Sequence, residues 1–156
     1  GTASQGVPFL FSGEEMLRTK QGVQNSFDSP DSINHLDWTN LKRYPQVFEY
    51  YRKLIKLRKD HPAFRLGRAD LVRKFLTFLP SQDAMVAFVL KNHAGRDSWR
   101  NIFVVLNGSK DTRTVIVPHA KYIVVCEKGQ IDEKGLSVFD STQISVNPQS
   151  ALIFHD

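Results

Sequence analysis

The sequence predicts a mainly β fold with some α structure, in which one strand–loop–helix (βα) unit precedes an antiparallel β-sandwich. The run from Val7 to Phe11 is apolar without alternation, as in a strand buried on both faces of a parallel sheet. Residues 45–60 repeat apolar side chains at spacings of three and four, which indicates an amphipathic helix. After residue 66, short runs rich in Val, Ile and Phe alternate with turn-forming residues, which favours a sandwich.

The N-terminal unit should contain a strand, a long polar loop and the helix. We expect the strand over Val7–Ser12, with Gly13 ending it and residues 14–16 turning the chain. The stretch Asn25–Asn34 is dominated by Asn, Asp, Ser and Pro, which favour Asx turns over regular structure. A polar loop after a buried strand is where α/β enzymes place binding groups, so this loop is the candidate site.

The helix should begin at Tyr44-Pro45 and end at His61-Pro62, because the residue before proline is disfavoured in helical geometry. Trp38, where the chain enters the helix, is expected to pack against its neighbours. We assign the basic residues of this helix to its solvated face; they are Arg52, Lys53, Lys56, Arg58 and Lys59.

The remainder is predicted to be all β, with no helix between the strands. The expected strands are Leu71–Leu79, Ala84–Leu90, Asn101–Leu106, Arg113–Val117, Tyr122–Cys126, Leu136–Phe139, Gln143–Val146 and Ala151–His155. The change in pattern predicts two domains, 1–65 and 66–156. A single βα unit cannot cover both faces of its own strand, so we expect this chain to be the C-terminal end of a larger protein.

Composition excludes several classes of protein. The net charge is +5, but the 21 Lys and Arg residues are spread along the chain. This distribution favours a solvent-exposed helix face, where the basic residues are densest, over a nucleic-acid-binding stripe. No apolar run approaches the roughly 20 residues of a membrane span, and the compartment stays open. Cys126, the one cysteine, lies in an apolar run and is expected to be a buried structural thiol.

Two motifs carry a family resemblance. GVPFLFSGEE resembles the eighth strand of the α-amylase superfamily barrel, and GEEMLRTKQGVQNSFDSPDSINHLDW is similar to bacterial type I pullulanases. The β-rich remainder, including Asn147–Leu152, is similar to the sandwich domain that follows that barrel. Phe27 departs from the pattern because pullulanases commonly have tyrosine there, and His35 lies where the family varies. The resemblance implies the last βα unit of a (β/α)8 barrel followed by a C-terminal sandwich.

The resemblance also implies an activity for the parent protein: retaining hydrolysis of α-1,6-glucosidic linkages in α-glucans such as pullulan, starch or glycogen branches. Its nucleophile aspartate, acid/base glutamate and stabilising aspartate belong to barrel strands upstream of this chain. We therefore expect no catalytic residue here and no activity from the chain alone. The alternative is a noncatalytic β-sandwich module that binds glucan or a protein partner.

Glu14 and Glu15 are the obvious carboxylates to test as a catalytic pair. Retaining glycosidases need carboxyl groups about 5–5.5 Å apart on opposite sides of the scissile bond. Neighbouring residues at a strand end point to opposite faces, so both cannot reach one sugar. We expect instead that one carboxylate caps or anchors the loop and that the other packs against hydrogen-bond donors at the barrel end.

The candidate substrate-binding residues are polar side chains of the loop. They are Arg18, Asn25, Asp28, Asp31 and Asn34. Such groups donate to and accept from sugar hydroxyls, but Asn and Asp also form turns, and Arg18 could pair with a nearby carboxylate. Both interpretations stay open for the set.

Three further expectations concern metal, tryptophan and association. Asp28, Asp31 and Asp37 offer oxygen ligands for calcium in the parent enzyme, although their spacing does not match an EF-hand. Trp99 is expected to pack at the sandwich edge rather than to form an accessory glucan site. Val7–Ser12, without neighbouring strands, should pair with another copy or lie against the sandwich, so the chain is expected to self-associate.

Overall fold

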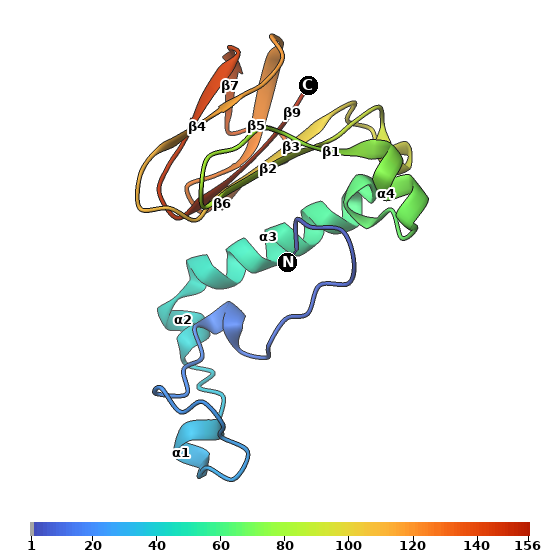
Figure 1. Cartoon of the computed structure of the whole chain (residues 1–156). Coiled ribbons are helices and arrows are strands. Elements are labelled where there is room, and N and C mark those ends of the chain that lie inside the picture. The colour runs from blue at the N-terminus through green and yellow to red at the C-terminus, as the bar shows by residue number, and fades with distance from the viewer. Residues whose placement is uncertain (1) are drawn as a thin grey trace.

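The protein folds into a two-layered β-domain with a long helix beneath it and an N-terminal arm, residues 7–44, that extends away from it (Figure 1). The computed structural model describes residues 2–156. The larger sheet has seven strands in the order β1-β2-β3-β9-β5-β6, with β7 pairing with β5, and the smaller sheet pairs β4 with β8. All pairs are antiparallel. The strands are β1 (Leu76–Phe78), β2 (Met85–Leu90), β3 (Ile102–Asn107), β4 (Arg113–Ile116), β5 (Lys121–Glu127), β6 (Gln130–Ile131), β7 (Ser137–Asp140), β8 (Gln143–Val146) and β9 (Ser150–His155).

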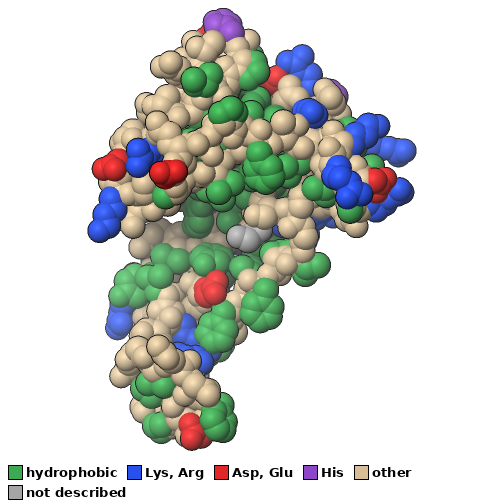
Figure 2. Space-filling view, viewed as in Figure 1, with side chains coloured by type: hydrophobic (Ala, Val, Ile, Leu, Met, Phe, Trp, Pro, Cys, Tyr) green, Lys and Arg blue, Asp and Glu red, His purple; other side chains and the backbone are tan. Residues whose placement is uncertain are grey.

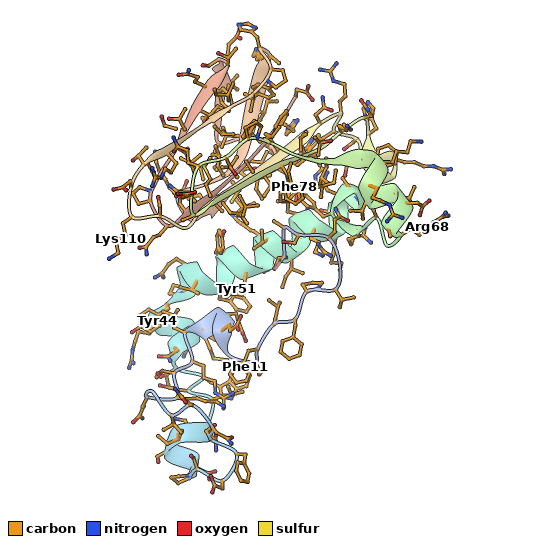
Figure 3. All side chains as sticks on the ribbon, viewed as in Figure 1. Phe11, Tyr44, Tyr51, Arg68, Phe78 and Lys110 are labelled. Atoms are coloured by element: carbon orange, nitrogen blue, oxygen red, sulfur yellow. The ribbon has the colours of Figure 1, made fainter. Side chains whose placement is uncertain are left out.

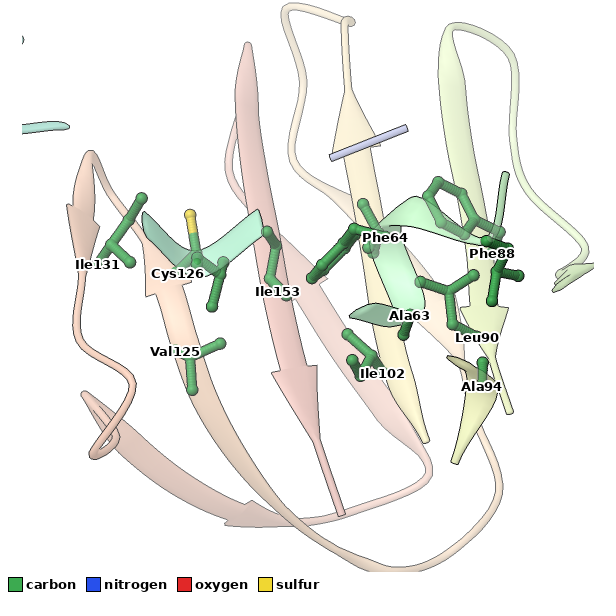
Figure 4. Close-up of a cluster of buried hydrophobic side chains, with 13 residues drawn as sticks. Ala63, Phe64, Phe88, Leu90, Ala94, Ile102, Val125, Cys126, Ile131 and Ile153 are labelled. Carbon is green, nitrogen blue, oxygen red and sulfur yellow. The ribbon is translucent and has the colours of Figure 1, made fainter. Parts of the chain in front are cut away.

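Both faces of the larger sheet pack against other elements of the chain. Between the two sheets, the rings of Phe103, Tyr122 and Phe154 lie 4.9–5.2 Å apart in stacked and edge contacts. On the other face, Leu57 and Phe64 pack into a second buried cluster (Figure 4). Strands β2 and β3 are therefore buried along almost their whole length, which explains why their sequences do not alternate. The predicted antiparallel sandwich is confirmed.

The helices are mostly short and frame the arm and the edge of the sheet. They are η1 (Glu14–Met16), α1 (Asp31–Asn34), α2 (Asn40–Arg43), α3 (Pro45–Asp60), η2 (Pro62–Arg65), α4 (Ala69–Phe75) and η3 (Ala94–Arg96). The predicted helix α3 is confirmed, with Pro45 in its first turn and Pro62 just beyond its end. It runs beneath the larger sheet and joins the arm to the β-domain (Figure 1).

The assignment of all five basic residues to a solvated helix face is wrong for Arg58. Its side chain is buried and donates to the backbone oxygens of Thr2 at 2.9 Å, Ser4 at 2.6 Å and Gly6. Residues 2–6 cross the helix here, and their carbonyl groups need donors that the segment itself does not provide. Burial, with Arg65 nearby, lowers the pKa of Arg58.

The expected buried strand at Val7–Ser12 is absent from this chain. Residues 7–11 have no regular secondary structure, and Val7 and Phe9 are 96% and 90% exposed. A strand forms only where neighbouring strands pair with its N–H and C=O groups and other layers cover its side chains. Within residues 2–156, neither is supplied to this segment.

Three local expectations were also wrong. The run Leu71–Leu79 is not a single strand, because Ala69–Phe75 forms α4, whose Leu71, Val72 and Phe75 pack against the buried cluster, and β1 holds only three residues. In the polar loop, Asp31–Asn34 forms the single-turn helix α1. Trp38, expected to pack, is 63% exposed in this chain.

The remaining expected strands are present to within one or two residues at their ends, and the two-residue β6 is an addition. Phe64 and Leu66 lie in the same buried cluster as Phe88, so the parts expected at 1–65 and 66–156 share a core. The division into a barrel portion and a sandwich domain stays a prediction. None of the helices in residues 2–156 has the length and apolar character needed to cross a membrane.

Candidate functional site

The base of the polar loop is fixed by the two neighbouring glutamates. Glu15 Oε2 accepts a hydrogen bond from the backbone N of Gly13 at 3.1 Å, and Glu14 Oε2 accepts one from the Tyr51 hydroxyl of α3 at 3.4 Å. Partial burial, followed by the charge of Glu14, raises the pKa of Tyr51. The two carboxylates therefore make different structural contacts, Glu15 with the backbone of the loop and Glu14 with α3.

Arg18 joins the two ends of the loop. Its guanidinium donates to the backbone oxygen of Ser12 at 3.3 Å and to that of Asn34 at 2.5 Å. The same group lies 5.1 Å from the ring centroid of Phe11, within cation–π range. The partners are thus carbonyl groups and an aromatic ring, not the carboxylate considered from sequence, while the buried Nε has no hydrogen-bond partner in the described part of the chain.

Asn34 closes the loop through its side-chain amide. Its Oδ1 accepts from the Ser26 hydroxyl at 2.8 Å, and its Nδ2 donates to the backbone oxygens of Ser26 at 2.6 Å and Ser29 at 2.9 Å. Three of its hydrogen-bonding positions are thereby used. Asn34 consequently shapes the loop and has little capacity left for a ligand.

The other three candidates lie apart from this centre. Asn25, Asp28 and Asp31 are exposed. Asp31 starts α1 and uses its backbone oxygen to accept from the backbone N of His35 and to contact His35 Nδ1. The structure brings together only Arg18 and Asn34 of the five candidate residues.

A polar cleft of about 320 Å³ lies between η1, α1 and α2. It is lined by Met16, Leu17, Arg18, Thr19, Gln21, Ser32, His35, Asp37, Asn40, Arg43 and Tyr44. Sequence reasoning missed Asp37, Asn40 and Arg43 as members of one site and set His35 aside. Their only advance signal was the density of polar residues between Asn34 and Tyr44.

Hydrogen bonds beside the cleft favour the ionised form of the Asp37 carboxyl group. Hydrogen bonds from the Thr39 hydroxyl and then the Thr39 backbone N–H lower the pKa of Asp37. Arg43 donates to Asn40 Oδ1 at 3.4 Å on the same side. The cleft thus combines guanidinium and amide donors with a carboxylate acceptor, a set suited to neutral polyhydroxylated ligands.

No cluster of three or more His, Cys, Asp or Glu side chains suited to a metal is present in residues 2–156. Asp28, Asp31 and Asp37, considered as calcium ligands, do not form such a cluster. The cleft is lined by polar groups that can donate or accept hydrogen bonds.

Trp99, considered as an accessory sugar site, is instead packed between two histidines. Its ring stacks on His61 at 3.5 Å and on His155 at 4.0 Å between centroids. The buried Asp97 carboxylate accepts from His61 Nδ1 at 2.8 Å, from the backbone N of Trp99 at 3.0 Å and from that of Ala63 at 3.2 Å. The expectation that Trp99 is a packing residue is confirmed, and this Asp97 cluster joins the end of α3 to the sandwich.

Comparison with known proteins shows that the chain is similar to pullulanases. Residues 72–130 match the family model described as pullulanase, all-beta domain. The pullulanase of Bacillus subtilis (strain 168) is 40% identical over 131 residues, which are 83% of this chain and 18% of that protein.

Solved structures extend the match over the whole chain. The pullulanase from Bacillus acidopullulyticus is 42% identical with a TM-score of 0.94, and the match covers 99% of this chain and 19% of that one. The type I pullulanase from Bacillus subtilis str. 168, solved with maltose, is 36% identical with a TM-score of 0.87, covering 96% of this chain and 21% of that one. The chain spans about a fifth of the length of these relatives. Over almost its whole length the chain is therefore similar to a segment of the bacterial type I pullulanases.

Proposed function

We propose that this chain is the C-terminal part of a starch- and pullulan-debranching enzyme that hydrolyses α-1,6-glucosidic linkages by a retaining mechanism. In this proposal, residues 1–65 supply the last strand, loop and helix of a (β/α)8 barrel whose catalytic aspartates and glutamate lie upstream, and residues 66–156 form the following sandwich. The observation that carries the proposal is the structural match, which includes the arm as well as the β-domain, at 42% identity.

The exposed apolar residues of the arm support a missing barrel. Figure 2 shows hydrophobic side chains at the surface of the arm below the β-domain. Val7 and Phe9 are almost fully exposed, and an apolar groove of about 250 Å³ between the arm and α3 is lined in part by Leu10, Phe48 and Ile55. Figure 3 labels Phe11 and Tyr51 in this region of the arm and α3. Seven further strands and their helices would cover such surfaces.

The polar cleft supplies the proposed contact with glucan. Pullulanases of this family have been solved with maltose and with maltotetraose, so related chains bind α-linked glucose oligomers. Arg43 and Asp37 offer one donor group and one acceptor group at the cleft wall. We place the sugar contact of this segment there, with Arg18 and Asn34 holding the loop, and leave Asn25, Asp28 and Asp31 outside the cleft.

The decisive experiment measures release of reducing ends from pullulan by the 156-residue chain and by the full parent protein. The chain alone should show none, and the parent should be active. In the parent, Arg43→Ala should raise KM more than it lowers kcat, whereas the matched exposed control Arg73→Ala should change neither. Hydrolysis by the chain alone would refute the upstream placement of the catalytic residues.

The alternative function, a noncatalytic glucan- or protein-binding sandwich, makes a different prediction. Retention of the chain on a glucan affinity gel that is unchanged by Arg43→Ala, with an inactive parent, would favour it.

Self-association of the isolated chain follows from its uncovered arm. Light scattering should give a mass above that of one copy, and Phe9→Asp should reduce it, because Phe9 is 90% exposed. A monomer at all concentrations would contradict this.

A further inference from the structure

The face of the larger sheet that α3 covers is covered at one end only. Leu90, Ile102 and Ile153 are buried beneath α3 and η2. At the other end of the same face, Phe78 and Val86 are 69% and 45% exposed. Strand register places these residues on that face, since Phe78 is opposite Phe88, and Val86 lies two residues before it.

The uncovered end forms a groove of about 350 Å³, which we call the β1–β2 groove. Its apolar wall includes Leu76, Phe78, Val86 and Leu106, and its edge is formed by Ser4 and Gln5 of the N-terminal segment. Figure 3 labels Phe78 on the side of the sheet that faces α3. The groove continues the buried cluster, because Leu76 and Leu106 pack against that cluster and the Phe78 and Phe88 rings meet edge to face at 6.2 Å.

The chemistry of the groove excludes a charged or sugar ligand. None of its lining residues is charged. The Gln5 amide is already used, donating to Ala63 O at 2.7 Å and accepting from the backbone N of Leu66 at 3.1 Å. An occupant must therefore be apolar, as expected for packing between protein elements.

We propose that the β1–β2 groove is the docking surface for the polypeptide that directly precedes this segment in the parent enzyme, which lies in it with an apolar face. The inference rests on the proposed place of the chain in a longer enzyme. Relatives are about five times longer than this chain. The N-terminal segment lies next to the groove, because residues 4 and 5 form its edge and are held there by Arg58 and by the Gln5 bonds. Docking would extend the covering of this sheet face from α3 to the β1 edge.

The test measures how fast a maleimide reagent labels a thiol introduced by Phe78→Cys, in the 156-residue chain and in the full parent. The control is Ile116→Cys on β4, because Ile116 is 67% exposed, close to the 69% of Phe78, but lies on the smaller sheet. The native Cys126 is 1% exposed and should not contribute.

In the chain, both introduced thiols should react at similar rates. In the parent, labelling at position 78 should be slower by at least about tenfold, while labelling at 116 is unchanged. Equal labelling at position 78 in chain and parent would overturn the proposal. Protection in the isolated chain that grows with protein concentration would also overturn it, because a second copy would then be the occupant.

A second measurement needs no substitution. Amide hydrogen exchange of residues 76–78 should be slower in the parent than in the chain, since β1 is an edge strand whose outer side is unpaired here. The outcome is separable from the proposed activity. If position 78 is protected in a parent that does not hydrolyse pullulan, the docking surface is supported and the proposed function is refuted. If the parent hydrolyses pullulan but position 78 is not protected, the proposed function is supported and the docking surface is refuted.

Discussion

Asp97→Ala should be among the most destabilising single substitutions in this chain. The Asp97 side chain is fully buried and accepts three hydrogen bonds, from His61 Nδ1 and from the backbone N–H groups of Ala63 and Trp99. Each donor left unpaired costs roughly 1–3 kcal/mol. Water entering the vacated space reduces the total, so we expect a loss of about 3–5 kcal/mol in the free energy of unfolding, against about 5–15 kcal/mol for a whole domain.

Asp97→Asn separates charge from shape. The amide keeps one acceptor oxygen but places an NH₂ group against one of the three donors, so the loss should be smaller, about 1–3 kcal/mol. The assay is urea unfolding followed by circular dichroism at pH 7. Asp83→Ala, at an exposed position, is the control and should change stability by less than about 0.5 kcal/mol.

The pH dependence gives a second check on Asp97. Burial acts to raise the pKa of this carboxyl, but the hydrogen bonds from His61, Trp99 and Ala63 outweigh it, and the pKa lies below its usual value. The contribution of the Asp97 carboxylate to the free energy of unfolding is therefore fully present above the unfolded pKa of about 3.9, and it is lost as the pH falls through the pKa of the folded state. The difference between wild type and Asp97→Asn should shrink below about pH 4. A substitution of Asp97 by Ala that matches Asp83→Ala at pH 7 would refute the reasoning.

Three further predictions concern other contacts. Gly13→Ala should destabilise the loop by about 1–3 kcal/mol, because Gly13 has φ +98° and a Cβ would lie 2.7 Å from Arg18 Cβ; faster proteolysis of the arm should report it. Arg58→Leu should speed amide exchange of residues 2–6 about tenfold without unfolding the sandwich, since three carbonyl groups lose their donor; unchanged exchange would contradict the clamp. Burial lowers the pKa of His155, so the contribution of this side chain to the free energy of unfolding is fully present above the unfolded pKa of about 6.5 and is lost as the pH falls. The variant His155→Phe should therefore lose less stability than the wild type between pH 7 and pH 5, as measured by thermal unfolding.

The parts of the fold that sequence predicts well are those whose pattern is local. The spacing of Leu54 and Leu57 and the two flanking prolines define α3, and Val-rich runs bounded by turn residues define β2, β3 and β5. Segment 71–75 fails because Leu71, Val72 and Phe75 suit either structure, and packing against the buried cluster selects the helix. The strand expected at Val7–Ser12 fails for a non-local reason, since no strand within residues 2–156 pairs with this segment.

The site was predicted only in part, because it also depends on contacts between residues that are distant in sequence. The loop and the anchoring role of its glutamates follow from residue type and position. Composition does not show which side chains turn inward, because Arg18 and Asn34 set the loop shape through bonds that span eight to sixteen residues. Those bonds bring His35, Asp37 and Arg43 around one cleft and leave Asn25 and Asp28 outside it.

The position of β9 also has a consequence for synthesis of the protein. This strand lies in the middle of the larger sheet, hydrogen-bonded to β3 on one side and β5 on the other, although it comes last of the nine in sequence. On the ribosome, β3 emerges long before its partner, and at about 5–20 residues per second the intervening stretch takes several seconds to make. During that interval the inner edges of β3 and β5 have no neighbour, so a nascent chain is open to mispairing or chaperone binding until residues 150–155 appear.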